Sequence, residues 1–266
     1  MVKIVGILNV TPDSFSDGGK FFKTNDAVKQ AEKLIEEGAD IIDIGGESTR
    51  PGSKPVPIEE EIKRVVPVIK EIKKKIPGIP VSVDTYKPEV ALKAIDEGCE
   101  IVNDIYGMRW QDGEMASIVA KNNVKVVIMH MQGTPQTMQT NPQYKNVISD
   151  IKQFFSLQIK FAESKGIKKE KIIIDPGIGF GKTLQHNLQI LKKLNQFKEL
   201  NQPIMVGPSR KSFIGTLLNV DVSQRLEGTI ASVLISVING ADYLRVHDVL
   251  SVKRAITVLE AICDYV

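Results

Sequence analysis

The chain has 266 residues, of which 42% are hydrophobic and 25% are charged, a balance that is typical of globular domains and argues against disordered, collagen-like and coiled-coil proteins. Its length is compatible with one domain, because single barrels routinely reach about 250 residues. The 35 basic and 32 acidic residues leave a net charge of +3, which is too small for a protein that neutralises many phosphates, so we expect no nucleic-acid partner.

Strand-like and helix-like segments alternate from one end of the chain to the other. Short apolar runs predict eight strands, at 3–10, 41–46, 80–84, 101–105, 125–130, 171–175, 203–207 and 243–247. Stretches of helical periodicity predict eight helices, at 25–37, 58–76, 88–97, 113–122, 147–165, 185–197, 223–240 and 251–265. The strand runs carry Val and Ile on both faces, which is typical of parallel strands that are covered on both sides.

Eight strand–helix units in 266 residues, about 33 residues each, predict a single-domain (β/α)8 TIM barrel of the α/β class. A doubly wound open sheet is the alternative, but it usually has five or six strands, and its dinucleotide-binding form has a glycine-rich first turn. The connections 11–24 and 47–57, after the first two strands, are unusually long. We expect them to be flexible loops at the carboxyl end of the barrel, where chemistry takes place in this fold.

The cysteines and the apolar segments indicate a cytoplasmic protein. Cys99 and Cys263 are the only cysteines, and their spacing fits neither a disulfide framework nor a zinc site. The amino-terminal segment lacks the core and the cleavage site of a signal peptide, and no apolar run approaches the roughly 18 residues that span a bilayer. We therefore expect no membrane partner.

Every predicted strand ends on polar side chains, although a buried strand should carry them only where they are paired or functional. In chain order they are Asn9, Asp43, Asp84, Asn103, Asp104, His130, Asp175, Ser209, Arg210, Lys211, Arg245, His247 and Asp248. Any one of them could be a helix cap or part of a solvated barrel rim. Convergence from all the strands favours a catalytic mouth.

The residue types at the strand ends suggest two binding regions. Two carboxylates, an amide and an ammonium group suit the edge of a flat, nitrogen-rich ring such as a pterin or a purine. These groups belong to Asp84, Asn103, Asp175 and Lys211. Arg245 and His247 end the last strand just before a helix, so cations and free backbone amides meet there and favour phosphate. Arg245 could instead be a structural ion-pair partner inside the barrel.

Nucleotide-binding and zinc motifs are incomplete. The run 177–183 resembles a phosphate-binding P-loop, but its first glycine would have to stand where the chain has Pro176. The three histidines lack metal-ligand spacing, which argues against zinc. Mg2+ is the expected metal, because it needs only one or two protein oxygens, from Asn9 or a nearby aspartate, when a diphosphate supplies others.

Two long stretches carry a resemblance to a known family. Residues 6–19, GILNVTPDSFSDGG, resemble the first signature of the dihydropteroate synthases, and residues 43–52, DIGGESTRPG, resemble the second loop of that family. Shorter similar stretches follow in the same order, at 82–85, 102–105, 129–131, 133–135, 137–139, 175–182, 209–215 and 245–248. The resemblance covers essentially the whole chain and implies that 1–266 form one pterin-binding (β/α)8 barrel domain.

The resemblance implies an Mg2+-dependent enzyme of folate biosynthesis. Such an enzyme joins 4-aminobenzoate to 6-hydroxymethyl-7,8-dihydropterin diphosphate and releases diphosphate and 7,8-dihydropteroate. Because an arylamine needs no base to react, we expect an SN1-like path in which the C–O bond of the pterin substrate ionises first and the leaving group is stabilised electrostatically.

The matching motifs also imply a role for each part of the mouth. The pterin is expected to bind Asp84, Asn103, Met129, Asp175, Phe180 and Lys211. The aminobenzoate pocket is expected to consist of Thr49, Arg50, Pro51 and Ser212. The diphosphate is expected to bind Asn9, Arg50, Arg245 and His247, with the metal at Asn9. The residues expected to act in catalysis are Asp17 in the first loop, Asp84, Lys211, Arg245 and His247.

Three other functions are alternatives. A pterin-dependent corrinoid methyltransferase would share the barrel and the Asp84–Asn103 ring site but would not need the Thr-Arg-Pro loop or the anion site. A non-catalytic pterin-binding protein would not need polar residues at every strand end. A phosphate-binding aldolase would need a lysine within a strand as a Schiff base, for which the chain offers no candidate. For quaternary structure we expect a homodimer that pairs through the predicted helix 223–240.

Overall fold

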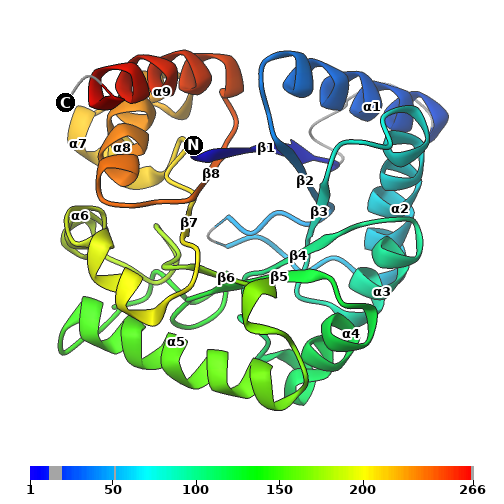
Figure 1. The fold of residues 1–266 in the computed structure, drawn as a ribbon, viewed down its shortest axis with the longest axis horizontal. Coiled ribbons are helices and arrows are strands. Elements are labelled where there is room, and N and C mark those ends of the chain that lie inside the picture. Colours follow the sequence, from blue (N-terminus) through cyan, green and yellow to red (C-terminus); the bar gives the residue numbers. More distant parts are fainter. Residues whose placement is uncertain (12–19, 51, 265–266) are drawn as a thin grey trace.

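The computed structural model describes residues 1–11, 20–50 and 52–264 and shows a barrel of strands inside a ring of helices (Figure 1). Eight parallel strands form one sheet in the order β6-β5-β4-β3-β2-β1-β8-β7. Their bounds are β1 Lys3–Asn9, β2 Ile41–Gly45, β3 Val81–Asp84, β4 Ile101–Asp104, β5 Lys125–Met129, β6 Ile172–Asp175, β7 Met205–Val206 and β8 Tyr243–Val246. Ile174 of β6 forms a parallel bridge to Ile204, which brings the two edges of the sheet together. The predicted (β/α)8 barrel is confirmed.

The helices cover the outside of the strands (Figure 1). Their bounds are α1 Lys20–Glu36, α2 Ile58–Lys75, α3 Pro88–Asp96, α4 Glu114–Asn122, α5 Val147–Ser164, α6 Leu184–Lys192, α7 Ser212–Leu218, α8 Leu226–Ile238 and α9 Val249–Asp264. Short 3-10 helices are η2 Trp110–Gly113, η3 Lys169–Lys171, η4 Leu194–Leu200 and η5 Val222–Gln224. Within the described ranges, no helix combines the length and the apolar character needed to cross a membrane.

Each strand buries both of its faces. Outward side chains such as Ile42 and Val102 pack with the helices in one large core. Inward side chains at the amino ends of the strands form a separate apolar layer, the barrel floor: Val5, Ile41, Ile101, Val127, Ile173, Met205 and Tyr243. Side chains two residues apart on a strand share a face. The next inward positions, such as Asp43, Asn103 and Asp175, therefore put polar groups at the mouth of the same barrel.

Several helix boundaries differ from the prediction: α6 ends at Lys192 rather than at 197, and α8 spans Leu226–Ile238 rather than 223–240. α1 begins at Lys20 rather than at 25. Thr24 and Asn25, which are residue types favoured at helix caps, therefore lie inside the helix. α7 was not predicted, because its 7 residues are too few to show a helical period in a window of about 11–18 residues. The predicted first loop therefore overlaps α1, and residues 12–19 lie outside the described residues. The flexibility of both long loops stays a prediction.

Candidate active site

A cavity opens at the carboxyl ends of the strands and leaves about 330 Å3, open solvent included, unfilled by atoms. Its lining residues are Thr49, Asp84, Asn103, Ile105, Met129, Asp175, Gly177, Ile178, Phe180, Gly207, Lys211 and Arg245. All six residues predicted to hold the pterin are among them. The strand register explains part of this convergence, because Asp84 lies opposite Asn103 and Met129 lies opposite Asp175.

Arg245 connects the charged groups of this cavity. Its Nε donates to Asp43 Oδ2 at 2.6 Å, and its Nη2 donates to Asp84 Oδ2 at 2.7 Å. Asn103 Nδ2 donates to the same oxygen of Asp43 at 3.2 Å, so Asp43, which the sequence left without a role, orients two lining residues. Burial alone would lower the pKa of Arg245, but the two carboxylates raise it above its usual value. Arg245 thus forms ion pairs inside the barrel, which was the alternative to a binding role, and it also lines the cavity.

Burial raises the pKa of both carboxyls expected to bind the pterin. The pKa of Asp84 rises to about 7 although Arg245 opposes the rise. That of Asp175 rises to about 6 although Gly177 N–H donates to its Oδ1 at 2.7 Å. Asp84 Oδ1 is buried and has no hydrogen-bond partner among the residues that the structure describes. Because an unpaired buried acceptor is unfavourable, this oxygen is well suited to an N–H group of a ligand.

Lys211 and Phe180 also line the cavity. Lys211 Nζ lies 4.0 Å from the centroid of the Phe180 ring, and burial lowers the pKa of Lys211 to about 8. The preceding Arg210 has a φ of +57°, in the left-handed region, and its Nε donates to Asp248 Oδ2 at 3.0 Å. This ion pair anchors the turn that presents Lys211. The cavity therefore combines an aromatic face and a cation with two carboxyls and an amide.

The other predicted site residues are placed in different ways. Thr49 lines the cavity. Four described residues are not among those that line this cavity: Asn9, Arg50, Ser212 and His247. His247 Nδ1 lies 3.0 Å from Ser209 Oγ, and burial lowers the pKa of His247 to about 3, so this side chain is neutral rather than the expected cation. Asp17 and Pro51 lie outside the described residues.

Lys182 binds main-chain carbonyl groups beside the cavity, a role that the sequence did not indicate. Its Nζ donates to the carbonyl oxygens of Phe180 at 2.9 Å and of His130 at 3.2 Å. Burial lowers the pKa of Lys182 to about 7, and that of His130 to about 2. Lys182 therefore holds the loop that carries Phe180, and its ammonium group is turned to main-chain oxygens rather than to a phosphate.

The donors at the mouth fit a magnesium ion that a substrate brings with it. Asn9, at the end of β1, offers one amide oxygen. In the described part of the chain, no group of three or more His, Cys, Asp or Glu residues is arranged to hold a metal. Mg2+ keeps several waters and takes oxygens from substrate phosphates, so one or two protein oxygens are enough. The donor set fits Mg2+ shared with a diphosphate better than zinc, which prefers nitrogen and sulfur ligands.

Fold and site together define a (β/α)8 barrel whose mouth is suited to a flat, nitrogen-rich ring. Residues 5–247 match the family model described as pterin binding enzyme. A curated relative from Clostridium beijerinckii, a dihydropteroate synthase, is 50% identical over 253 residues, which cover 95% of this chain and 91% of that protein.

Two solved structures are similar over nearly the whole length. The dihydropteroate synthase from Clostridium difficile, crystallised in the presence of pteroic acid, has a TM-score of 0.92 and 47% identity and covers 98% of this chain and 96% of its own. The enzyme from Xanthomonas albilineans with 4-aminobenzoic acid has a TM-score of 0.91 and 43% identity, with 98% and 93% covered. The chain therefore belongs to the pterin-binding enzyme family and, within it, to the dihydropteroate synthases.

Proposed function

We propose that the protein condenses 4-aminobenzoate with 6-hydroxymethyl-7,8-dihydropterin diphosphate to give 7,8-dihydropteroate and diphosphate, a step of folate biosynthesis. One observation carries the proposal: groups that match a pterin edge and face converge on one cavity, from Asp84, Asn103, Asp175, Phe180 and Lys211. The relatives that were crystallised with pteroic acid and with 4-aminobenzoic acid support the same pair of substrates.

The pterin lies in this cavity with its polar edge toward the strand ends. Asp84 and Asp175 accept hydrogen bonds from ring N–H groups, Asn103 both donates and accepts, and Lys211 donates to a ring acceptor. Met129 and Phe180 contact the faces of the ring, and the polar groups contact its edge.

The reaction follows an SN1-like path. The C–O bond of the pterin substrate breaks, its electron pair leaves with diphosphate, and the cation on the methylene carbon spreads into the ring. Ionised Asp84 and Asp175 stabilise this cation, while Arg245 and His247 bind the departing diphosphate. The arylamine then attacks the carbon, and its extra proton passes to a diphosphate oxygen.

The remaining residues hold the metal and the second substrate. Asn9 would hold Mg2+, and the bound ion would supply positive charge near the leaving group. The aminobenzoate pocket includes Thr49, Arg50 and Ser212, with Arg50 also reaching the diphosphate. Pro51, which is expected there too, lies outside the described residues. Water must be excluded from the reacting carbon because it would otherwise capture the cation. Asp17, which is expected to act in catalysis, lies outside the described residues.

A reconstituted reaction tests this proposal. Purified protein, Mg2+, the dihydropterin diphosphate and 4-aminobenzoate should yield 7,8-dihydropteroate, detected by its mass, and omission of any component should prevent product formation. Pterin binding without turnover would instead indicate a non-catalytic pterin-binding protein. Methyl transfer from methyltetrahydrofolate to a corrinoid would indicate the methyltransferase. A covalent pterin–enzyme adduct after rapid quenching would contradict the SN1-like path.

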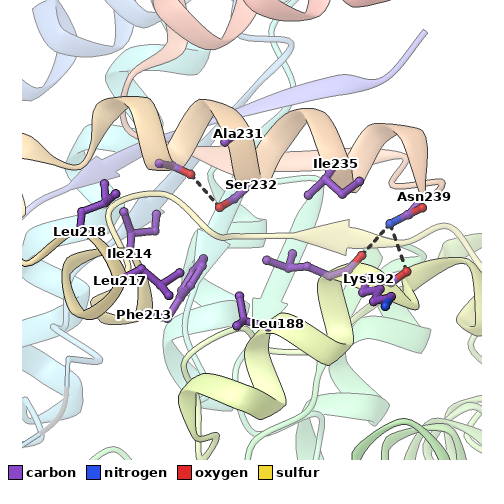
Figure 2. A pocket seen from close by; sticks show the side chains of 12 residues that line it. Leu188, Lys192, Phe213, Ile214, Leu217, Leu218, Ala231, Ser232, Ile235 and Asn239 are labelled. Carbon is purple, nitrogen blue, oxygen red and sulfur yellow. Dashed lines mark hydrogen bonds between the residues drawn. The ribbon is translucent and has the colours of Figure 1, made fainter.

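We further propose that the protein is a homodimer and acts in the cytoplasm. An apolar groove of about 1120 Å3, open solvent included, lies between α6, α7 and α8 (Figure 2). Leu217 and Leu218 on its rim are 53% and 50% exposed, and Ile235 is 38% exposed. Contiguous exposed apolar groups mark interaction sites, and α8 lies within the predicted pairing helix 223–240. Both cysteines are free, which is compatible with a reducing compartment.

Sedimentation velocity tests the homodimer. The wild-type protein should sediment with twice the mass of one chain, and Leu217→Glu, which places a charge on the rim of the groove, should sediment as a monomer. A monomeric wild-type protein would contradict the proposed dimer.

A further inference from the structure

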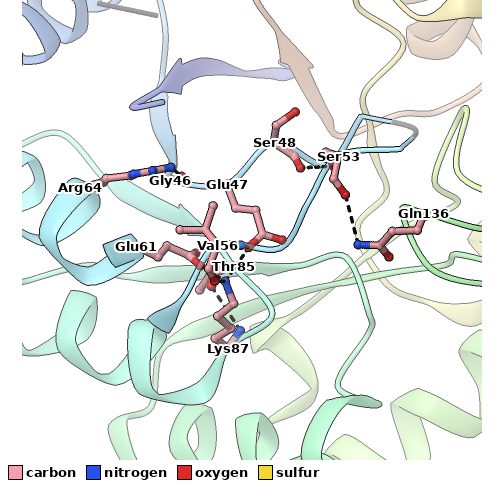
Figure 3. Close-up of polar contacts among 10 residues, drawn as sticks. All are labelled: Gly46, Glu47, Ser48, Ser53, Val56, Glu61, Arg64, Thr85, Lys87 and Gln136. Atoms are coloured by element: carbon pink, nitrogen blue, oxygen red, sulfur yellow. Dashed lines mark hydrogen bonds and ion pairs between the residues drawn. The ribbon is translucent and has the colours of Figure 1, made fainter. Parts of the chain in front are cut away.

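Lys87 joins three parts of the chain beneath the segment 46–57, which follows β2 and is called the second loop below (Figure 3). Its Nζ donates to Glu47 Oε2 at 2.6 Å, to the Val56 carbonyl oxygen at 2.6 Å and to Glu61 of α2. The Lys87 side chain is 6% exposed, and those of Glu47 and Glu61 are 7% and 1% exposed. An ammonium group and two carboxylates are thus buried together at the base of the second loop.

The same cluster closes the second loop at its two ends. Glu47 Oε2 also accepts a hydrogen bond from Val56 N–H at 2.7 Å, so the ends are joined directly as well as through Lys87. Arg64 of α2 adds a bond from its Nη1 to the Gly46 carbonyl oxygen at 2.8 Å (Figure 3). Closing a loop at its base restricts the conformations of every residue between the two ends.

The side-chain contacts at the tip of the second loop are exposed. Ser53 Oγ donates to the Ser48 carbonyl oxygen at 2.5 Å, and Gln136 Nε2 donates to the Ser53 carbonyl oxygen at 3.2 Å. Water competes with exposed hydrogen bonds, so they contribute little on their own. The tip nevertheless carries Thr49, which lines the cavity, and Arg50. The main chain of the tip adds hydrogen bonds from Gly52 N–H to the Pro135 carbonyl oxygen at 3.1 Å and from Ser53 N–H to the Arg50 carbonyl oxygen at 3.0 Å. The base differs from these contacts in holding the second loop through buried charged groups, and it therefore restricts where Thr49 and Arg50 lie.

The charge balance makes the base sensitive to the loss of Lys87. Burial raises the pKa of Glu61, and the Lys87 ammonium group opposes that rise. Without Lys87, Glu47 and Glu61 would share a buried space without a cation, which is unfavourable for both carboxylates. Either water would have to reach the two carboxylates or one of them would have to bind a proton. Both changes would weaken the contacts that hold the ends of the second loop.

We propose that Lys87 is a positioning residue for aminobenzoate, because it fixes the base of the second loop and thereby holds Thr49 and Arg50 at the cavity. This inference rests on the proposed function, which assigns aminobenzoate to the second loop. The pterin depends instead on side chains at the ends of β3, β4 and β6. The two substrates should therefore respond differently to a change at Lys87.

Steady-state kinetics of Lys87→Met test the inference, with Lys73→Met as a matched control. Lys73 Nζ also donates to two carbonyl oxygens, of Pro77 and Ile79, and pairs with Glu100, but at the amino end of the barrel. In Lys87→Met, KM for 4-aminobenzoate should rise roughly tenfold, while KM for the dihydropterin diphosphate changes less than about twofold. In Lys73→Met both KM values should stay within about twofold of wild type. Lys87→Arg should restore most of the loss.

Amide hydrogen exchange provides a readout that needs no turnover. Exchange within 46–57 should be faster in Lys87→Met than in wild type and unchanged in Lys73→Met. An active wild-type enzyme whose Lys87→Met variant keeps the wild-type KM for 4-aminobenzoate would overturn the inference. If the wild-type protein forms no product, the proposed function is wrong, and unchanged exchange in Lys87→Met would then refute the anchoring separately.

A second variant covers the case in which Lys87→Met does not fold. Glu47→Gln keeps an oxygen that accepts from Val56 N–H but removes the charge that pairs with Lys87. We expect KM for 4-aminobenzoate to rise about threefold in this variant, with KM for the pterin substrate unchanged. Equal changes in the two KM values, or no change in either, would refute the role of Lys87.

Discussion

The two ends of the barrel interior differ in chemistry although the same strands build both. At the floor, Ile173 and Tyr243 belong to an apolar layer. Two residues later on the same strands, Asp175 and Arg245 line the cavity at the mouth. Side chains two residues apart on a strand share a face. An apolar residue at one position and a polar residue two positions later therefore build the floor and the mouth from the same strand.

This difference separates stability from binding. The floor side chains are satisfied by packing in the free protein. At the mouth, burial raises the pKa values of Asp84 and Asp175, and the buried Oδ1 atoms of Asp43 and Asp84 lack partners within the described residues. Such groups are unfavourable until a ligand reaches them. We therefore expect floor substitutions to change unfolding and most mouth substitutions to change binding.

Arg245→Ala should have the largest effect, because Arg245 is the mouth residue that also serves stability. Its loss leaves Asp43 and Asp84 buried without their cation, so the free energy of unfolding in urea should fall by about 3–5 kcal/mol. In titrations of the folded variant at pH 8, the affinity for diphosphate should fall more than about tenfold. The affinity for free pterin should fall less, although the loss of Arg245 raises the pKa of Asp84 further. Equal losses for the two ligands would contradict the placement of diphosphate at Arg245.

Ile173→Ala should weaken the floor alone. Removal of most of a fully packed side chain should lower the free energy of unfolding by about 2–5 kcal/mol, through lost burial and the cavity left behind. Isothermal titration of the folded variant should give the wild-type pterin affinity. A loss of about tenfold or more in that affinity would show that floor and mouth are not separable.

Asp175→Asn is the counterpart of Ile173→Ala, two residues further along the same strand. A neutral amide replaces the charged acceptor, so pterin affinity should fall by about 1.5–3 kcal/mol, roughly ten- to a hundredfold. The free energy of unfolding should stay unchanged or rise, because the variant no longer buries an ionisable group. Reduced stability together with unchanged pterin affinity would reverse the comparison between the two ends.

The sequence predicts the strands and the barrel because each rests on a local pattern, and the polar strand ends such as Asp175 indicate four of the six cavity residues expected to bind the pterin. Met129 and Phe180 were expected only from the resemblance to the dihydropteroate synthases. It could not decide the partner of Arg245, because Asp43 is 202 positions away and only the closed barrel brings the two together. The charge of His247 likewise depends on burial by distant segments. Lys87 directly precedes Pro88, the first residue of α3, which is an ordinary pattern for a helix start. Nothing in the neighbouring sequence therefore indicates that Lys87 contacts the second loop.

The pH dependence should have a smaller effect, with opposite signs for stability and for binding. Burial raises the pKa of Asp84 from 3.8 to about 7 and that of Asp175 to about 6. The native state then binds more protons than the unfolded state, so the stabilising contribution of these groups is present below about pH 4 and is lost as the pH rises toward 7. A pterin edge needs ionised acceptors, so its affinity should instead increase about tenfold from pH 6 to pH 8.

Titration of 6-hydroxymethyl-7,8-dihydropterin at both pH values, with Asp84→Asn as the control, measures this dependence. In the control the affinity should increase only about twofold, because Asp175, with a pKa of about 6, is already about half ionised at pH 6. A wild-type affinity that did not change with pH would mean that the ring does not meet Asp84 as an ionised acceptor. The mouth would then bind its ligand mainly through apolar packing, the same interaction that holds the floor side chains together. The chemical difference between the two ends would then have no role in binding.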